Sequence, residues 1–344
     1  MVKNKTKGYV MHRSIIRLLL SIVMILSVFI LAGCQAAARD TSLTKEEVKP
    51  SSADMQAQEN YTIALVMKTL TNPFFVDMEK GARQAEKDFN IKLVVQTGAQ
   101  ETSIEQQIQI VEELIAQKVD AIVIAPGSST DLVQVLKKAQ DAGIVIVNID
   151  NRLDRDQSQK QGLQGVPFIS VKNDDAAYQS VQYMISLWKG NGQAIVLEGI
   201  RDAENAQLRK EGAMKAFDEN AQITVVASES ANWKIDEAYE VSKQLLGEYP
   251  DTGLIFCAND MMALGVVQYL KEESLKDKLL AGFDNLEDAR NAIREGWMDV
   301  TIDQQASEQG YKGIESAVRI LQGESVDSEI YIPVKVITAA DVRE

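Results

Sequence analysis

From residue 61 onward, short apolar runs alternate with longer amphipathic stretches. The short runs are rich in β-branched residues and nearly continuous in apolar character, as expected for strands covered on both faces. They are residues 61–67, 91–97, 121–125, 144–150, 168–171, 194–197, 223–227, 254–258, 279–284 and 300–304. Helical periodicity appears between them, at 74–89, 103–117, 131–142, 174–189, 204–218, 235–248, 260–272, 286–295 and 308–321. This alternation predicts parallel sheets with right-handed crossovers, and its length favours two sheets over one.

The alternation breaks once, at residues 151–167. This stretch is polar, rich in glutamine and glycine, and has no apolar periodicity. Such composition is typical of a connection and not of a packed element. We therefore expect the chain to cross between two domains there.

The first 33 residues have the pattern of a segment that is removed. Five basic residues and no acidic one precede an uncharged run at 18–32, which ends in Leu31-Ala32-Gly33-Cys34. A basic start, a short apolar stretch and small residues at the cut predict a secretory signal. The 15-residue run is shorter than the about 20 residues needed to span a bilayer. Leu-Ala-Gly-Cys resembles the bacterial lipobox, which implies lipidation of Cys34; the alternative is a signal-anchor helix.

Residues 34–59 contain no aromatic residue and few apolar ones. A segment of this composition cannot bury enough apolar surface to form a core. We expect it to act as a solvated tether between the lipid anchor and the folded domain.

Charge and rare residues exclude several classes of function. Without the five basic residues of the signal, 31 basic residues face 50 acidic ones, a net charge of −19. This field repels nucleic acid and anionic lipid, so membrane contact is expected only through the lipid on Cys34. The single histidine, His12, lies in the signal, and Cys257 is the only other cysteine. His-based triads, His-ligated zinc and an internal disulfide are thereby excluded, and we predict neither metal nor cofactor.

Polar side chains follow five of the predicted strands. They are Lys68, Asp150, Asn259, Asp284 and Gln304. In open parallel sheets, ligands bind beyond the carboxyl ends of the strands. One such residue is most often a helix N-cap, and Asn259 and Asp284 are well placed for that role. Five together are better explained by one shared polar ligand.

Aromatic residues accompany the polar ones. Asn72-Pro73-Phe74-Phe75 follows the first strand; Asn72 and Pro73 fit the N-cap and the first helical position. At least one of the two phenylalanines should lie at the mouth of a cleft, and Trp233 is a second candidate wall. Flat rings stack on the apolar faces of a sugar while carboxylates, amides and cations bind its hydroxyls. The set therefore favours a sugar ligand.

Three motifs in combination resemble a known family. They are residues 68–75 continuing to 77–81, Cys257-Ala258-Asn259-Asp260-Met261-Met262-Ala263-Leu264-Gly265, and Gly282-Phe283-Asp284. The chain is similar in these motifs, and over most of 61–342, to the type I periplasmic sugar-binding proteins of ABC importers. It is most similar to the ribose- and allose-binding branch.

The resemblance implies a fold of two doubly wound parallel-sheet α/β lobes joined by a three-strand hinge. Crossings would lie near 151–167, 303–305 and 329–332. Lobe 1 would comprise residues 60–164 plus 305–329, and lobe 2 residues 165–304 plus 330–344. The lobes would close on a ligand held between them.

The resemblance also implies the binding residues. They are Lys68, Asn72, Phe74, Phe75, Asp150, Asn151, Arg209, Trp233, Asn259, Phe283, Asp284 and Gln304. Lys68 matches the allose type, whereas ribose binders have a small hydroxyl residue there. Asn151 and then Arg152 follow Asp150, where the ribose type has arginine and the allose type glutamate. A hexose, a pentose and a polyol all remain open.

The expected function is that of a monomeric, lipid-anchored, extracytoplasmic receptor that delivers a monosaccharide to an ABC permease. Two alternatives remain: a sugar or furanone receptor that feeds a sensor kinase or chemoreceptor, and a polyol-binding importer subunit. An enzyme is not expected. A dinucleotide or phosphate loop would need glycines after the first strand, and Thr69–Asn72 contains none.

Overall fold

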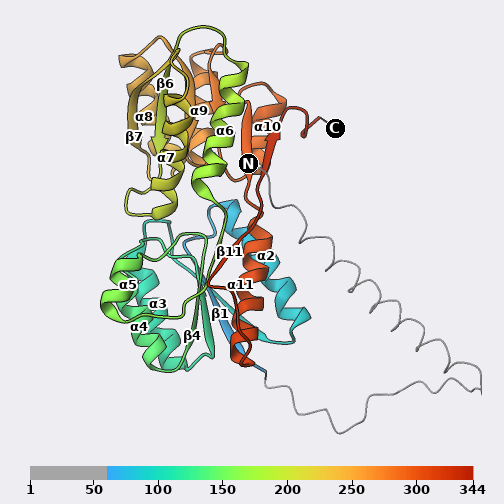
Figure 1. The fold of residues 1–344 in the computed structure, drawn as a ribbon. Helices are drawn as coiled ribbons and strands as arrows, with labels where there is room; N and C mark the ends of the chain where they lie inside the picture. Colours follow the sequence, from blue (N-terminus) through green and yellow to red (C-terminus); the bar gives the residue numbers. More distant parts are fainter. Residues whose placement is uncertain (1–59, 344) are drawn as a thin grey trace, which may run out of the picture. The chain divides into compact units, whose positions relative to one another are not determined.

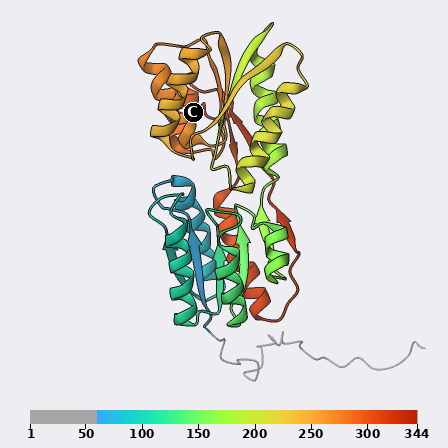
Figure 2. The same cartoon turned by 90° about the vertical axis from the view of Figure 1, so that its left-hand side faces the viewer.

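The computed structural model describes residues 60–343, which form two lobes, each built on a six-stranded sheet (Figures 1 and 2). The signal peptide, the lipidation site Cys34 and the tether to residue 59 lie outside the described residues. Helices flank each sheet in both views. The predicted fold class of two parallel-sheet α/β lobes is confirmed.

The first lobe has strand order β11-β5-β4-β3-β1-β2, with every neighbouring pair parallel. Its strands are β1 (Thr62–Met67), β2 (Lys92–Thr97), β3 (Ala121–Ile124), β4 (Val145–Ile149), β5 (Phe168–Ser170) and β11 (Glu329–Tyr331). Its helices are α2 (Pro73–Asp88), α3 (Ile104–Gln117), α4 (Val133–Asp141), α5 (Arg155–Gln161) and α11 (Ala306–Leu321). The central strands β1 and β3 are almost wholly buried, which explains their unbroken apolar sequence.

The second lobe has strand order β12-β10-β9-β8-β6-β7, and β12 is antiparallel to β10. Its strands are β6 (Gly192–Glu198), β7 (Ile223–Ser230), β8 (Thr252–Cys257), β9 (Leu279–Ala281), β10 (Val300–Asp303) and β12 (Lys335–Thr338). Its helices are α6 (Asn173–Leu187), α7 (Glu204–Asp218), α8 (Ile235–Glu248), α9 (Asp260–Glu272) and α10 (Glu287–Arg294). Among the described helices, none is both long and apolar enough to cross a bilayer.

The first crossing between the lobes lies later than the sequence predicts. Strand β5 pairs with β4 and β11 in the first sheet, so residues 165–170 belong to lobe 1 and the chain crosses at Val171–Lys172. The predicted crossing at 151–167 instead contains helix α5. This helix has seven residues and no buried side chain, so it leaves no apolar periodicity in the sequence. Its N-cap Asp154 accepts from the Gln157 backbone N–H at 2.7 Å. Three residues of strand are too few for pattern alone to assign β5 to a sheet.

The other two crossings lie close to their expected places. The chain returns to lobe 1 between β10 and α11, at Gln304–Gln305. It leaves again after β11, through residues 332–334, to reach β12. The predicted start of the last lobe 2 segment at residue 330 is wrong by a few residues, because Glu329–Tyr331 pairs with β5 in the first sheet.

Helix α11 packs against α2 almost backbone to backbone. A methyl group on Gly310 would lie 2.1 Å from the carbonyl oxygen of Met78, and one on Gly81 would lie 1.8 Å from that of Ser307. Real Cβ atoms do not approach carbonyl oxygens this closely, so one of the helices would have to move. Because α11 directly follows a strand of lobe 2, this packing fixes where the hinge enters lobe 1.

We predict that Gly310→Ala lowers the free energy of unfolding by about 1–3 kcal/mol through overpacking. Gly247→Ala is the matched control, because Gly247 also lies in a helix and a Cβ there meets nothing within 4 Å. The control should be neutral or stabilise by up to about 1 kcal/mol. Chemical denaturation measures both. Equal stability of the two variants would show that the helices separate without cost.

Candidate ligand-binding site

The carboxyl ends of the strands converge on a pocket with walls from both lobes. Its lining residues are Lys68, Asn72, Phe74, Phe75, Glu101, Asp150, Asn205, Arg209, Trp233, Asn259, Asp284 and Gln304. All five predicted strand-exit residues are among them. The cavity that these side chains enclose is only about 20 Å³. In this arrangement of the two lobes the side chains therefore nearly fill the pocket.

The first turn of α2 forms one wall. Asn72 caps this helix by accepting from the Phe74 backbone N–H at 3.0 Å, and its amide donates to Glu101 Oε1 at 2.9 Å. Phe74 and Phe75 meet edge to face, with ring centroids 5.0 Å apart. Both rings are buried and both line the pocket. The cap thus places two aromatic rings and a carboxylate on the same wall.

A buried ion pair lies beside these rings. Lys68 Nζ is 2.8 Å from Asp150 Oδ2, and each side chain is only 3% exposed. Asp150 has a left-handed backbone, with φ of 63°, that a non-glycine residue rarely adopts. Its peptide is held there because its N–H donates to the Ile169 carbonyl at 3.0 Å and its carbonyl accepts from Ser170 Oγ at 2.8 Å. Backbone strain maintained in this way is a frequent property of binding sites.

Arg209 is the centre of the second lobe's wall. Its guanidinium donates to Asn173 Oδ1 and to the Ala258 carbonyl, both at 2.8 Å, and to Gln304 Oε1 at 3.4 Å. It lies over the ring of Phe283, 3.7 Å from the centroid. Burial lowers the pKa of Arg209, while the charge of Asp284 opposes that shift. The guanidinium is thereby fixed in one orientation.

Asp284 faces the pocket because a different carboxylate, that of Asp260, accepts the backbone hydrogen bonds of the loop. Asp260 accepts from the backbone N–H groups of Phe283 and Leu286, each at 2.9 Å, and from Thr301 Oγ1. The prediction that Asp284 caps the helix at residue 286 is therefore wrong. Asp284 instead accepts from Gln304 Nε2 at 2.6 Å and lies 3.7 Å from Arg209 Nη1.

Trp233 closes the pocket from the second lobe. Its indole packs on Gly199, where a Cβ would lie 2.0 Å from the ring. The indole is 4% exposed, and its Nε1–H has no hydrogen-bond partner among residues 60–343. Asn259 lies nearby as the N-cap of α9, accepting from the Met262 backbone N–H at 2.9 Å. Its predicted cap role is confirmed, and it also lines the pocket.

Two predicted site residues do not line the pocket. Asn151 is fully buried; its amide donates to the Pro126 carbonyl at 3.1 Å, and its Oδ1 accepts from the Asn205 backbone at 3.2 Å. Phe283 is fully buried, and its ring centroid lies 3.7 Å from the Arg209 guanidinium. The family resemblance implied both residues, but in this structure their side chains contact other protein groups and do not line the pocket.

Two lining residues, Glu101 and Asn205, escaped the sequence analysis. Glu101 follows strand β2 by four residues, so the rule of strand exits pointed to its loop without singling it out. Asn205 lies in the first turn of α7, where a polar residue ordinarily faces solvent. Only the approach of the two lobes brings Asn205 Nδ2 to 3.4 Å from Asp150 Oδ1.

The pocket combines two cations with three carboxylates. The cations are Lys68 and Arg209, and the carboxylates are Glu101, Asp150 and Asp284. Burial raises the pKa of Glu101, and Lys68 and the hydrogen bond from Asn72 oppose the shift. Within the described chain, no group of three or more metal-ligating side chains is arranged to hold a metal ion. The arrangement can bind vicinal hydroxyls through donors and acceptors while the rings cover apolar faces.

Comparisons with known proteins agree with this geometry. Residues 63–325 match the family model described as a periplasmic binding protein domain. A D-ribose/D-allose-binding protein of Pseudomonas aeruginosa is 36% identical over 84% of this chain and 92% of its own length. The D-allose-binding periplasmic protein of Escherichia coli is 32% identical over 74% of this chain and 83% of its own length.

A solved structure is similar over the same region. The ABC transporter periplasmic solute-binding protein of Actinobacillus succinogenes, with bound D-allose, superposes with a TM-score of 0.78. It is 35% identical, and the match covers 82% of this chain and 99% of that one. On the extent of the family match and the identity to these relatives, the chain belongs to the periplasmic binding protein family.

Proposed function

We propose that this protein is the receptor of an ABC sugar importer and that it binds a monosaccharide, an allose- or ribose-like aldose, between its lobes. The observation that carries the proposal is the lining of the pocket: aromatic walls and five charged side chains from the two lobes face one another there. The named relatives are binding proteins and not enzymes, in agreement with the expectation that this chain catalyses no reaction.

The proposed ligand would be held by groups from both lobes. Lys68, Asn72, Glu101 and Asp150 would bind hydroxyls from lobe 1, and Phe74 and Phe75 would cover one face of the ring. Arg209, Asn259, Asp284 and Gln304 would bind from lobe 2, with Trp233 on the second face. Because only the closed arrangement offers both sets at once, the ligand favours closure.

An aldohexose of the allose type is the first candidate ligand. Lys68 adds a long cationic donor to the first wall, and it already pairs with Asp150 at 2.8 Å. Lys68 and Glu101 add two charged side chains to the carboxylate of Asp150 on the lobe 1 wall. D-Allose is the ligand bound in the similar solved structure, and D-ribose appears beside it in the name of a relative.

The setting of the receptor follows from its family. Periplasmic binding proteins work outside the cytoplasm, which places the folded chain there. We further propose that Cys34 carries a lipid that anchors a monomeric receptor to the membrane, and that the closed form docks on a permease. The lipobox-like Leu31-Ala32-Gly33-Cys34 supports the lipid anchor. The net charge of −19 after removal of the signal disfavours direct electrostatic binding to an anionic membrane surface.

We predict selective stabilisation by one sugar in a panel of aldoses, ketoses and polyols. Ligand at 100 times its dissociation constant adds about 2.7 kcal/mol, which raises the unfolding temperature by several degrees. Asp150→Ala and Asp284→Ala should each weaken binding about 10- to 100-fold, since each removes hydrogen bonds to a charged group. The exposed Asp218→Ala serves as the control and should bind normally. A folded protein that responds to no member of the panel would contradict the proposal.

We predict that Asp284→Asn stabilises the ligand-free protein in a pH-dependent way. Burial raises the pKa of Asp284 well above its ordinary range, with Arg209 opposing. The folded protein then keeps a proton that the unfolded chain has released, so wild-type stability falls as the pH rises through the raised pKa. The gain from Asp284→Asn should therefore be larger at about pH 8 than at about pH 5. A gain independent of pH in denaturation curves would refute this account.

We predict that Cys34→Ala moves the protein from the membrane fraction to the soluble fraction of cells. The change removes the thiol that would carry the lipid and leaves the folded lobes untouched. Immunoblotting of the two fractions measures the distribution, with Cys257→Ala as the control for loss of a buried thiol. Retention of Cys34→Ala in the membrane would favour the signal-anchor alternative.

A further inference from the structure

Helix α7 of lobe 2 begins where lobe 1 touches it. The first N–H groups of a helix have no acceptor within the helix, and its N-cap residue, Ala203, has no side chain to supply one. Lobe 1 supplies two acceptors. The Glu204 N–H donates to Ser129 Oγ at 3.0 Å, and the Asn205 N–H donates to Asn151 Oδ1 at 3.2 Å. The helix of one lobe is thus capped by side chains of the other.

Further contacts between the lobes surround this cap. The Ser129 backbone N–H donates to the Asp202 carbonyl at 3.4 Å, and Ser128 Oγ donates to the Asp202 carboxylate. Arg152 Nε lies 3.3 Å from Glu204 Oε2. We name these residues the latch: 128–129 and 151–152 of lobe 1 with 202–205 of lobe 2.

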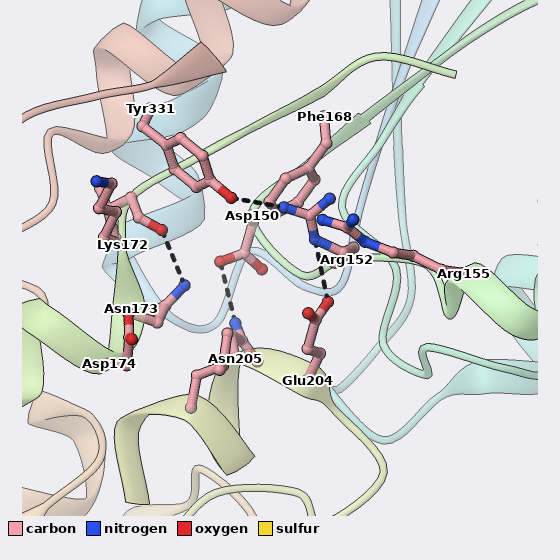
Figure 3. A pocket seen from close by; sticks show the side chains of 12 residues that line it. Asp150, Arg152, Arg155, Phe168, Lys172, Asn173, Asp174, Glu204, Asn205 and Tyr331 are labelled. Atoms are coloured by element: carbon pink, nitrogen blue, oxygen red, sulfur yellow. Dashed lines mark hydrogen bonds and ion pairs between the residues drawn. The ribbon is translucent and has the colours of Figure 1, made fainter. Parts of the chain in front are cut away.

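Side chains of lobe 1 fix the position of Arg152, which pairs with Glu204 of lobe 2. Its guanidinium lies 3.9 Å from the centroid of the Phe168 ring and donates to Glu329 Oε1 at 2.9 Å and to the Tyr331 hydroxyl at 2.8 Å. Arg152 lines an open cavity of about 360 Å³, which shares Asp150 and Asn205 with the ligand pocket. Figure 3 shows its guanidinium close to Tyr331 and Glu204. Because the side chain is already ordered, its pairing with Glu204 loses little conformational entropy.

Except for Asn205, the latch lies beside the ligand pocket and outside it. Ser128, Ser129, Asn151, Arg152 and Asp202 are not among the pocket's lining residues. The contacts that these residues make across the two lobes therefore need no ligand. Asn205 joins the two regions, since its backbone belongs to the latch and its side chain reaches Asp150 at 3.4 Å. At Asn151 the sequence also departs from both the ribose type and the allose type. Its contact with Asn205 of lobe 2 gives this residue a role other than ligand contact.

We infer that the latch closes the two lobes in part without ligand, and that it sets the apparent affinity for every ligand alike. A receptor whose binding-competent state has population f binds with an apparent dissociation constant equal to the intrinsic constant divided by f. Latch residues outside the pocket, such as Ser129 and Asp202, act on f alone. Pocket residues also change the preference between ligands. The second half of the inference rests on the proposed function, whereas the first half does not.

Hydrogen exchange of the ligand-free protein tests the closure directly. The amides of Glu204 and Asn205 have no partner within α7, so only the latch can slow their exchange. We expect protection in the wild type and exchange about five- to tenfold faster in Ser129→Ala and in Asp202→Ala. Asp202 is exposed, so the second variant does not endanger folding. Ser242→Ala, at a buried serine bonded within its own helix, is the control and should exchange as the wild type does.

Binding measurements on the same variants complete the test. Each latch variant should weaken the affinity for every sugar that binds by one common factor of about three to ten, with unchanged ratios between sugars. Unprotected amides in the ligand-free wild type would overturn the inference, and so would a loss that differs between sugars. If the wild type binds no sugar, the proposed function fails, while the exchange result still decides whether the latch closes.

Discussion

The ligand pocket depends on charged side chains that are buried away from water, each of which needs an ion-pair or hydrogen-bond partner. Arg209 is 3% exposed, and it is tolerated there because an amide oxygen and a carbonyl oxygen accept from its guanidinium and an aromatic ring lies under it. A buried charge without such partners would cost several kcal/mol, so the surrounding residues are fixed by its requirements. Lys68 and Asp150 meet the same constraint on the other side of the pocket.

Much of this site follows from sequence because the topology of a parallel sheet is restrictive. Strands that read as unbroken apolar runs must be covered on both faces, and their carboxyl ends must share an edge. Lys68 and Asp150 could therefore be placed together at the edge of one sheet, and Asn259, Asp284 and Gln304 at the edge of the other. That the two sets share one ligand was the simplest explanation of five polar strand exits. Arg209 could not be placed in this way, since an arginine in a polar helix has no local signal of burial; only the family resemblance indicated it.

Other features depend on contacts that no local pattern records. The three residues of β5 look alike whichever sheet they join, and only pairing with β4 and β11 assigns them to lobe 1. Asn151 and Asn205 are ordinary polar residues in sequence. Their roles arise from the meeting of two lobes, which is a property of tertiary structure. Asp260 is a similar case: it accepts the backbone hydrogen bonds at residues 283 and 286, a capping role that the sequence pattern suggested for Asp284.

The packing of α11 on α2 has a consequence for the order in which the protein folds. Lobe 1 takes α11 and β11 from beyond residue 305, after all of lobe 2 except its last strand, β12, has been made. Until then, the face of β3 and β4 that meets Gly313 lacks its cover; a Cβ on that glycine would lie 2.7 Å from Val123 and 3.0 Å from Ile149. Closing contacts across such a long stretch of chain slows folding. A polypeptide that leaves the cytoplasm before its last 40 or so residues are made therefore cannot complete its first lobe beforehand.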